Sequence, residues 1–290
     1  MRHSTTFLMS LIVASILVLM FLNLVLGSVS IPLKSVWNII CGRGDEPVTW
    51  QNIVWKSRLP QALTALVAGA GLAISGLQMQ TVFRNPLAGP SVLGISSGAS
   101  MGVAFVVLLS GSLGGVALSK LGFMGEIALS IAAVIGSLSV MALIVYVSQK
   151  VKGNVTLLII GVMIGYVANA VIGVLKFFSV EEDIRAYVIW GLGSFSRVSG
   201  NQMMLFVAIM AILIPLSFLL IKTLNLMLLG DGYARNLGLN IKRARLLVIT
   251  SAGVLTAIVT AYCGPVIFLG LAVPHPVSYT HLTLPTNREV

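Results

Sequence analysis

The stretch from Ser75 to Ser100 reads SGLQMQTVFRNPLAGPSVLGISSGAS and separates two long apolar segments. It contains an arginine, an asparagine, two prolines and several glycines, none of which suits a helix that faces lipid. Irregular backbone at membrane depth occurs only where protein or a water-filled cavity satisfies its polar groups. The stretch is therefore either a plain turn at the membrane surface or the lining of a pathway.

The composition indicates a polytopic membrane protein. Of the 290 residues, 57% are hydrophobic and only 9% are charged, whereas about 25% of the residues in soluble domains are charged. Basic loops on the cytoplasmic side explain the formal net charge of +10, and no DNA- or RNA-binding motif accompanies it. We expect no nucleic-acid partner. Cys41 and Cys263 provide neither a disulfide framework nor a metal cluster, so no cofactor is expected.

Seven apolar segments are predicted to cross the membrane, which takes roughly 20 residues each. They are Phe7–Leu26, Leu59–Val82, Leu93–Leu109, Phe123–Val147, Val155–Phe177, Met203–Ile221 and Leu246–Tyr262. Pro215 is expected to kink the sixth, and an eighth segment begins after Gly264 and Pro265. The residues from Gly27 to Arg58 and from Ser179 to Gln202 are predicted to be polar connections. The first segment is too long for a cleavable signal peptide.

Small residues recur at helical spacing in two of these spans. Ala65, Gly69 and Ala73 in the second predict close approach of a neighbouring helix. In the fifth span, one face carries Gly161, Gly165, Asn169 and Gly173. This face either packs against another helix through its glycines or places Asn169 on an aqueous path, because polar side chains in a span usually face the bundle interior.

The loop from Gly230 to Gly238 predicts a short helix outside the membrane. Gly230 breaks the preceding helix, Asp231 can cap a new one, and Gly238 can end it in the left-handed conformation. The other interpretation is a solvated basic loop, since Lys242, Arg243 and Arg245 follow. No Walker A pattern occurs in the sequence, so ATP-driven work would have to come from a partner protein.

A series of motifs resembles one family of transport proteins. The longest is Arg84-Asn85-Pro86-Leu87-Ala88 with Pro90, Leu93-Gly94, Ser96 and Gly98-Ala99. The others, in order, are Arg58-Leu59-Pro60, Trp190-Gly191-x-Gly193-Ser194, Leu229-Gly230-Asp231-x-x-Ala234-x-x-Leu237-Gly238 and Gly264-Pro265-x-x-Phe268-x-Gly270-Leu271-x-x-Pro274-His275. Over about residues 5 to 275 the chain resembles the permease subunits of ABC importers for iron–siderophore complexes, haem and cobalamin, the FecCD or BtuC type.

This resemblance implies an all-α polytopic bundle of the type II ABC importer permease kind and a transporter subunit rather than an enzyme. The chain would pair with a second permease copy, as a homodimer or heterodimer, above two ATPase subunits. A substrate-binding protein would deliver an iron–siderophore complex, haem or cobalamin, of which the siderophore class is commonest in the family. The mechanism would be alternating access in a bacterial plasma membrane. The N-terminus would be cytoplasmic, which the nearly balanced loop charges do not decide.

The resemblance also implies roles for individual residues. Asn85 and Leu87 would belong to the cytoplasmic gate of the translocation path, and Asn169 is the further candidate on that path. Arg58 would dock the substrate-binding protein, although a second arginine that is common three residues later is here Gln61. The coupling helix seated on the ATPase would comprise Gly230, Asp231, Ala234, Leu237 and Gly238.

Two other classes of function are weighed against this one. Gly94-Ile95-Ser96-Ser97-Gly98 matches the G-x-S-x-G pattern of hydrolases, but that pattern needs a strand before the serine, and here a membrane span follows it. An intramembrane serine hydrolase would also need a histidine on a neighbouring helix. A passive channel is the second alternative, and it would not need a coupling helix.

The residues after His275 depart from the family pattern. They are polar, too short to span a membrane and without helical periodicity. We expect residues 1–275 to form the permease domain, with about seven spans and the start of an eighth. Residues 276–290 are expected to be a non-native tail on a C-terminally truncated chain.

Overall fold

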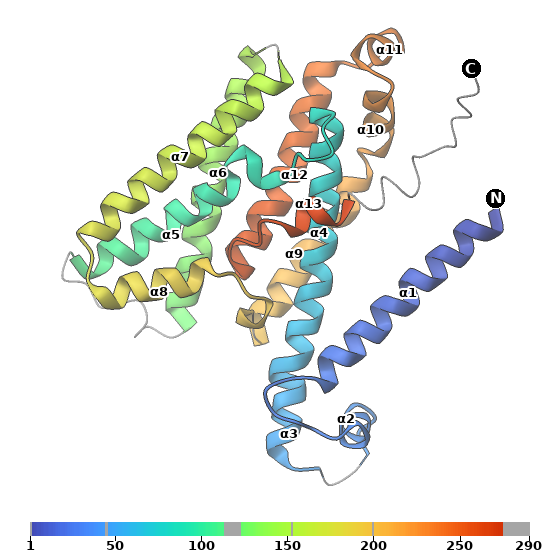
Figure 1. The fold of residues 1–290 in the computed structure, drawn as a ribbon, viewed down its shortest axis with the longest axis vertical. Coiled ribbons are helices and arrows are strands. Elements are labelled where there is room, and N and C mark those ends of the chain that lie inside the picture. The colour runs from blue at the N-terminus through green and yellow to red at the C-terminus, as the bar shows by residue number, and fades with distance from the viewer. Residues whose placement is uncertain (1, 44–45, 113–122, 152, 199, 275–290) are drawn as a thin grey trace, which may run out of the picture. The chain divides into compact units, whose positions relative to one another are not determined.

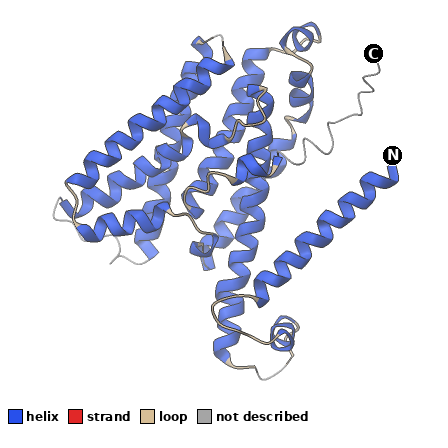
Figure 2. Cartoon of the chain, in the orientation of Figure 1, coloured by secondary structure: helices blue, strands red, loops and turns tan. Residues whose placement is uncertain are grey.

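The computed structural model describes the chain except for residues 1, 44–45, 113–122, 152, 199 and 275–290. Within that part, every regular element is a helix (Figure 2). The predicted all-α class is confirmed, while the predicted tail, residues 276–290, lies outside the described residues. The chain divides into two units, residues 1–66 with 195–207 and residues 67–194 with 208–290.

The first unit has a small apolar core. Its elements are α1 (Arg2–Val25), α2 (Leu33–Ile40), α3 (Val48–Ile53), the π-helical turn η1 (Val54–Arg58), the start of α4 (Leu59–Phe83), η4 (Phe195–Arg197) and the start of α9 (Gly200–Phe218). Its buried core consists of Leu24, Ile31, Val36, Ile39 and Val54. The short helices of this unit are therefore stabilised by burial of their apolar residues, because intrinsic propensity alone leaves helices of this length marginal.

The predicted polar connection between Gly27 and Arg58 is largely helical. It contains α2 and α3, and a helical run continues without a break from Val48 to Phe83 over 36 residues. Val36 in α2 and Val54 in η1 form part of the apolar core, and both side chains are at most 1% exposed. The charged residues of the region hid this pattern in the sequence.

The second unit holds most of the helices. Its elements are the rest of α4, η2 (Pro90–Leu93), α5 (Ile95–Ser112), α6 (Phe123–Lys150), α7 (Asn154–Phe177), α8 (Glu181–Gly191), the rest of α9, α10 (Ile221–Leu228), α11 (Asp231–Asn236), α12 (Ile241–Cys263) and α13 (Leu269–Ala272). Figure 1 shows α5, α6 and α7 running side by side. The central core of this unit includes Leu93, Ile95, Ile144, Val248 and Ile249.

Backbone meets backbone where α5 crosses α6. A Cβ atom added to Gly136 would lie 2.2 Å from the carbonyl oxygen of Gly98, and one added to Gly102 would lie 2.2 Å from that of Ala132. Gly98 and Gly102 form a G-x-x-x-G pattern on α5, which allows two membrane helices to approach closely. The close packing in the seam between α5 and α6 therefore requires glycine at these positions, because a Cβ atom would collide with the facing backbone.

The predicted small-residue stripe of the second span does not mark its closest contact. A Cβ atom on Gly69 would meet only the end of the Leu269 side chain, at 3.8 Å. The tightest position on α4 is Gly76, where a Cβ atom would lie 1.8 Å from the carbonyl oxygen of Gly270 near α13. Helical spacing predicted that one face of this span packs closely on a neighbour, but the position of the segment around Gly270 decides which glycine makes the contact.

All seven predicted apolar segments are helical among the described residues. Four helices are long and apolar enough to cross a membrane, and a bent pair is a fifth candidate. They are Val48–Phe83, Met124–Lys150, Val155–Phe177, Ile241–Cys263 and the pair Gln202–Phe218 with Ile221–Leu228. Two shorter apolar helices, Met9–Val25 and Ile95–Leu109, lie where the first and third spans are predicted.

The bend in the sixth span lies later than predicted. Pro215 is inside α9, and the helix continues to Phe218 before the chain turns at Leu219 and Leu220. There α10 leaves at 46° to α9. Proline removes one helical hydrogen bond, but α9 continues for three residues beyond Pro215 before it ends at Phe218.

Candidate functional site

The segment that links α4 to α5 is an ordered irregular turn. Helix α4 ends at Phe83, and Arg84 then takes a φ angle of +49°. This conformation is uncommon for a residue with a side chain and costs about 1–3 kcal/mol, so surrounding contacts have to maintain it. One of them is the Gln80 side-chain amide, which donates a 2.9 Å hydrogen bond to the carbonyl oxygen of Pro86.

The second half of this segment packs on α7. The turn η2 is followed by Gly94 at a φ angle of +74°, where a Cβ atom would lie 2.9 Å from the carbonyl oxygen of Gly161. Leu93 is completely buried. The segment is thus fixed at one end by α4 and at the other by α7.

Within the turn, the Asn85 side chain is hydrogen-bonded to the backbone, whereas the Leu87 side chain is exposed. The Asn85 side-chain oxygen accepts a 2.9 Å hydrogen bond from the backbone N–H of Leu87. This local hydrogen bond mimics a backbone turn. The Leu87 side chain is 65% exposed.

Polar side chains before the turn tie α4 to α12. Ser75 is fully buried, and its hydroxyl donates to the carbonyl oxygen of Ala252 at 2.9 Å and lies 2.8 Å from the Thr256 hydroxyl. Gln78 donates to the Ser251 hydroxyl at 3.1 Å. Hydrogen bonds of this kind hold membrane helices together where water is absent.

The predicted short helix after Gly230 is present as α11. Gly230 has a φ angle of +103° and Gly238 one of +86°, so both ends use conformations that favour glycine. Asp231 does not cap the helix as predicted: Gly230 occupies the cap position, and no side chain completes the cap. Asp231 lies in the first turn, where a negative charge is favourable.

Asp231 joins α11 to the turn at the end of α4. Its Oδ1 accepts a hydrogen bond from the Arg84 guanidinium, in an ion pair whose side chains are 47% and 41% exposed. Its Oδ2 lies 3.9 Å from the Arg245 guanidinium on α12. The turn that carries the predicted gate residues and the predicted coupling helix are therefore joined through one carboxylate.

The outer face of α11 is apolar and exposed. Tyr233 is 72% exposed and Leu237 is 62% exposed, whereas Ala234 is fully buried against the rest of the unit. Figure 1 shows α11 beyond the start of α12. Tyr233 is absent from the predicted coupling residues, and its exposed aromatic ring beside Leu237 was not apparent from the sequence.

The glycine face of α7 is used at one end only. Gly161 packs against the backbone of Val92 and Leu93, with contacts of 2.7 and 2.9 Å for an added Cβ atom, while a Cβ atom on Gly173 would meet nothing within 4 Å. The Asn169 side chain is exposed. The packing interpretation is confirmed for Gly161, and the path interpretation for Asn169 stays a prediction.

Arg58 is turned into the first unit. Its side chain is 5% exposed, and its guanidinium donates to the carbonyl oxygens of Leu24 at 2.8 Å, Val25 at 2.7 Å and Val29. Charged hydrogen bonds of this kind satisfy carbonyls that the end of α1 leaves without helical partners. In this conformation Arg58 holds the chain that leaves α1.

A buried carboxyl group lies at the start of α8. Asp183 is 4% exposed, and its Oδ2 has no hydrogen-bond partner among the described residues. Burial, together with the neighbouring Glu182 charge, raises the pKa of the Asp183 carboxyl above its ordinary value of 3.8. A raised pKa means that the folded state holds this proton more tightly than the unfolded state does.

Stability should therefore depend on pH through Asp183. Its contribution is fully present below the unfolded pKa and is lost as the pH rises through the raised folded pKa. As the pH falls from 7 towards 4, the Tm of the wild type should rise relative to that of Asp183→Asn. Thermal unfolding in detergent measures this difference. Glu181→Gln, exposed in the same turn, is the control, and an Asp183→Asn difference that does not change with pH would contradict the prediction.

The described residues contain no catalytic or metal-binding constellation. No group of three histidine, cysteine, aspartate or glutamate residues is close enough to hold a metal ion within that part of the chain. Ser96 of the G-x-S-x-G match is buried in the first turn of α5, which follows a 3-10 turn rather than a strand. His275 and His281 lie outside the described residues.

The family, relatives and solved structure that follow are similar to this chain, and each is described as a transport protein or a transporter. The FecCD transport family model matches residues 15–283. The hemin transport system permease protein HmuU of Yersinia pestis is 34% identical over 86% of this chain and 72% of the relative. The vitamin B12 import system permease protein BtuC of Serratia proteamaculans is 36% identical over 80% of this chain and 67% of the relative. A solved metal-chelate type ABC transporter in an inward-facing conformation is 27% identical, with a TM-score of 0.76 over 93% of this chain and 79% of that chain.

Proposed function

The chain belongs to the FecCD transport family, and from this premise we propose that it imports an iron–siderophore complex, haem or cobalamin with energy from a separate ATPase. It is a multi-pass membrane permease of an ABC importer and not an enzyme. HmuU and BtuC carry hemin and vitamin B12 in their names. Our preference for an iron–siderophore complex rests only on its frequency in the family.

The observation that carries the proposed coupling is the Asp231 ion pair. Helix α11 presents Tyr233 and Leu237 outward, which is the geometry of a helix that seats in a groove of a partner. Asp231 at its start holds Arg84 at the end of α4. A displacement of α11 by an ATPase would therefore act directly on the segment that carries Asn85 and Leu87. A passive channel has no use for such a helix.

The proposed path is opened and closed by the segment after α4. The exposed Leu87 side chain serves as a gate residue, and the turn held by Asn85 sets its position. Asn169, exposed on α7, faces the path once a second permease copy, identical or similar, completes the cavity. The transition between inward-facing and outward-facing states is alternating access.

The proposed orientation places the N-terminus and α11 in the cytoplasm. Lys242, Arg243 and Arg245 then lie at the cytoplasmic end of α12, in agreement with the preference of basic residues for that side. A substrate-binding protein docks on the opposite side. Arg58 takes part in that docking only in a conformation that releases its guanidinium from the carbonyl oxygens of α1.

The function is tested by uptake. Cells without their own uptake systems for these compounds would express the chain with the ATPase and binding protein encoded beside it. They should accumulate one of three labelled compounds, a ferric siderophore, haem or cobalamin, and only when the ATPase can hydrolyse ATP. Accumulation that persists with an inactive ATPase would support a passive channel and overturn the proposal.

Leu237→Glu tests the docking face of α11 in the same cells. Leu237 is 62% exposed, so the change leaves folding intact but removes an apolar contact of about 1.5–3 kcal/mol. We expect transport-linked ATP hydrolysis to fall by about tenfold or more. Leu192→Glu is the matched control, because Leu192 is 76% exposed and follows α8. Equal effects of the two changes would exclude α11 as the docking face.

A further inference from the structure

A basic cavity lies between the end of α6, α11 and the start of α12. Its volume is ≈ 460 Å³, and its lining includes four cationic side chains, Lys150, Arg235, Lys242 and Arg245. The only carboxylate in its lining, Asp231, is already paired with Arg84 and Arg245. The cavity therefore carries positive charge that no described residue neutralises.

Arg245 in this cavity needs an acceptor. Its side chain is 13% exposed, and its Nε is buried without a hydrogen-bond partner among the described residues. Leaving a buried donor of a charged group unsatisfied costs about 1–3 kcal/mol or more. An anion in the cavity would accept this hydrogen bond and offset the cost.

The basic residues also lie at the unfavourable end of their helix. Lys242, Arg243 and Arg245 fall in the first turns of α12, where cations oppose the helix dipole and anions are favoured. The Asn240 side chain already accepts the Arg243 N–H at this N-terminus, so the helix dipole and the basic side chains are what favour an anion such as a phosphate group there.

Two further cavities extend from the basic one along α12. The next, ≈ 430 Å³, is lined by Gln149, Lys242, Arg243, Leu246 and Leu247, and it shares Gln149 and Lys242 with the basic cavity. The third shares Leu247 with the second. The three cavities thus form a series whose lining changes from cationic to mixed to apolar.

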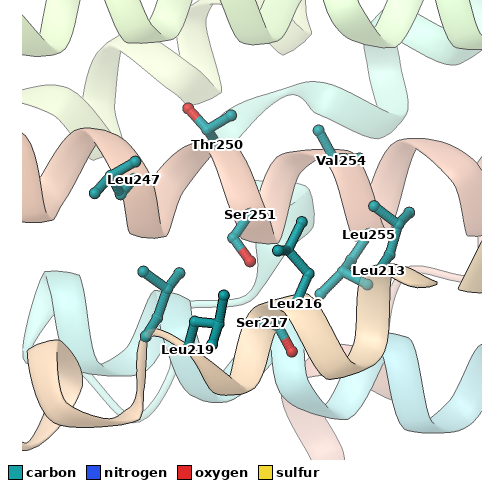
Figure 3. A pocket seen from close by; sticks show the side chains of 10 residues that line it. Leu213, Leu216, Ser217, Leu219, Leu247, Thr250, Ser251, Val254 and Leu255 are labelled. Atoms are coloured by element: carbon teal, nitrogen blue, oxygen red, sulfur yellow. The ribbon is translucent and has the colours of Figure 1, made fainter. Parts of the chain in front are cut away.

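The third cavity is a groove between the end of α9 and α12. It has a volume of ≈ 330 Å³, and its lining is mostly leucine from both helices, with Val254 and the hydroxyl side chains of Ser217, Thr250 and Ser251 (Figure 3). From Lys242 to Leu255, α12 rises about 20 Å at 1.5 Å per residue. One leaflet of the hydrocarbon core is about 15 Å thick, so the series has the length of a lipid that stands in one leaflet.

We propose that these three cavities bind one anionic phospholipid, with its phosphate among Lys150, Lys242 and Arg245 and an acyl chain in the groove between α9 and α12. Basic pockets beside membrane helices recognise anionic headgroups in this way. An acidic segment of a protein would satisfy the cations but would leave the apolar groove empty. The inference rests on the membrane assignment and is independent of the substrate carried.

The experiment measures lipid binding by the purified, delipidated chain with native mass spectrometry. Dioleoyl phosphatidylglycerol and dioleoyl phosphatidylcholine share acyl chains and differ in net charge. We expect phosphatidylglycerol to bind at least about tenfold more tightly. Lys150→Gln with Lys242→Gln should weaken phosphatidylglycerol binding by about 25-fold, at about fivefold for each charge removed, and should leave phosphatidylcholine binding unchanged.

The matched control removes two exposed lysines from the first unit, Lys34→Gln with Lys56→Gln, and should change neither affinity. Equal binding of the two lipids, or equal effects of the two double variants, would overturn the proposal. Complete displacement of phosphatidylglycerol by millimolar inorganic phosphate would show an anion site without an acyl-chain groove and would also overturn it. Loss of ATPase co-purification in Lys150→Gln with Lys242→Gln, without loss of lipid, would assign the cavity to a protein contact and overturn the proposal.

Discussion

Gly136→Ala is expected to destabilise the protein, whereas Gly173→Ala is expected to stabilise it. An alanine normally improves a helix by about 0.5–1 kcal/mol relative to glycine. At Gly136 the added Cβ atom would lie 2.2 Å from the carbonyl oxygen of Gly98, and two helix backbones would have to separate. Overpacking of this kind costs about 1–3 kcal/mol or more, so the sign reverses.

Leucine in place of alanine at these two positions should enlarge the difference in stability between the variants. Gly136→Leu should remove the folded protein from the membrane fraction, because α5 and α6 could no longer approach. Gly173→Leu should be present at the wild-type level, since a Cβ atom there meets nothing within 4 Å. Fluorescence-detected size-exclusion chromatography and thermal unfolding in detergent measure both. A wild-type profile for Gly136→Leu would contradict the α5–α6 seam described above.

Asp231→Arg is expected to abolish coupling without preventing folding. The change places three guanidinium groups together, from positions 84, 231 and 245, where the wild type has two around one carboxylate. The pair of Arg84 and Asp231 is exposed, so its own contribution to stability is about 0–1 kcal/mol. We therefore expect a normal level in the membrane but a fall of about tenfold or more in transport-linked ATP hydrolysis.

Exchanging the two charges distinguishes the effect of breaking the ion pair from the effect of losing Asp231 itself. Arg84→Asp combined with Asp231→Arg restores opposite charges and should recover part of the coupled hydrolysis. Arg84→Gly removes the guanidinium but accepts the φ angle of +49° without strain, so it should fold and transport poorly. Lys222→Glu, an exposed charge reversal on α10, is the control. A double exchange no better than Asp231→Arg alone would refute the link between α11 and the turn.

The sequence predicted the membrane class and the seven apolar helical segments because both depend on local composition. A run of apolar residues forms a helix in lipid whatever its neighbours are, since no other conformation satisfies its backbone. It also predicted α11, whose two ends require glycine for steric reasons that act within a few residues. The short helices α2 and α3 were missed, because their apolar faces become visible only when α1 covers them.

The site residues divide in the same way. The motif around Asn85 and Leu87 was recognisable, but the sequence did not show that the Asn85 oxygen would be used by the Leu87 N–H. The expected cap at Asp231 was wrong because Gly230 occupies the cap position, and the Asp231 carboxylate instead pairs with a distant arginine. G-x-x-x-G at Gly98 and Gly102 is a local signal that could have identified the α5–α6 seam.

The sequence by itself determined an all-α membrane permease of the FecCD transport family, through its apolar runs and the order of its motifs. Only the tertiary structure decided which glycines lie in helix seams and that Arg58 faces inward. It also decided that Asp231 binds Arg84, 147 residues away along the chain. Such contacts depend on where two helices meet in space, and the local pattern around either residue does not contain the position of the other.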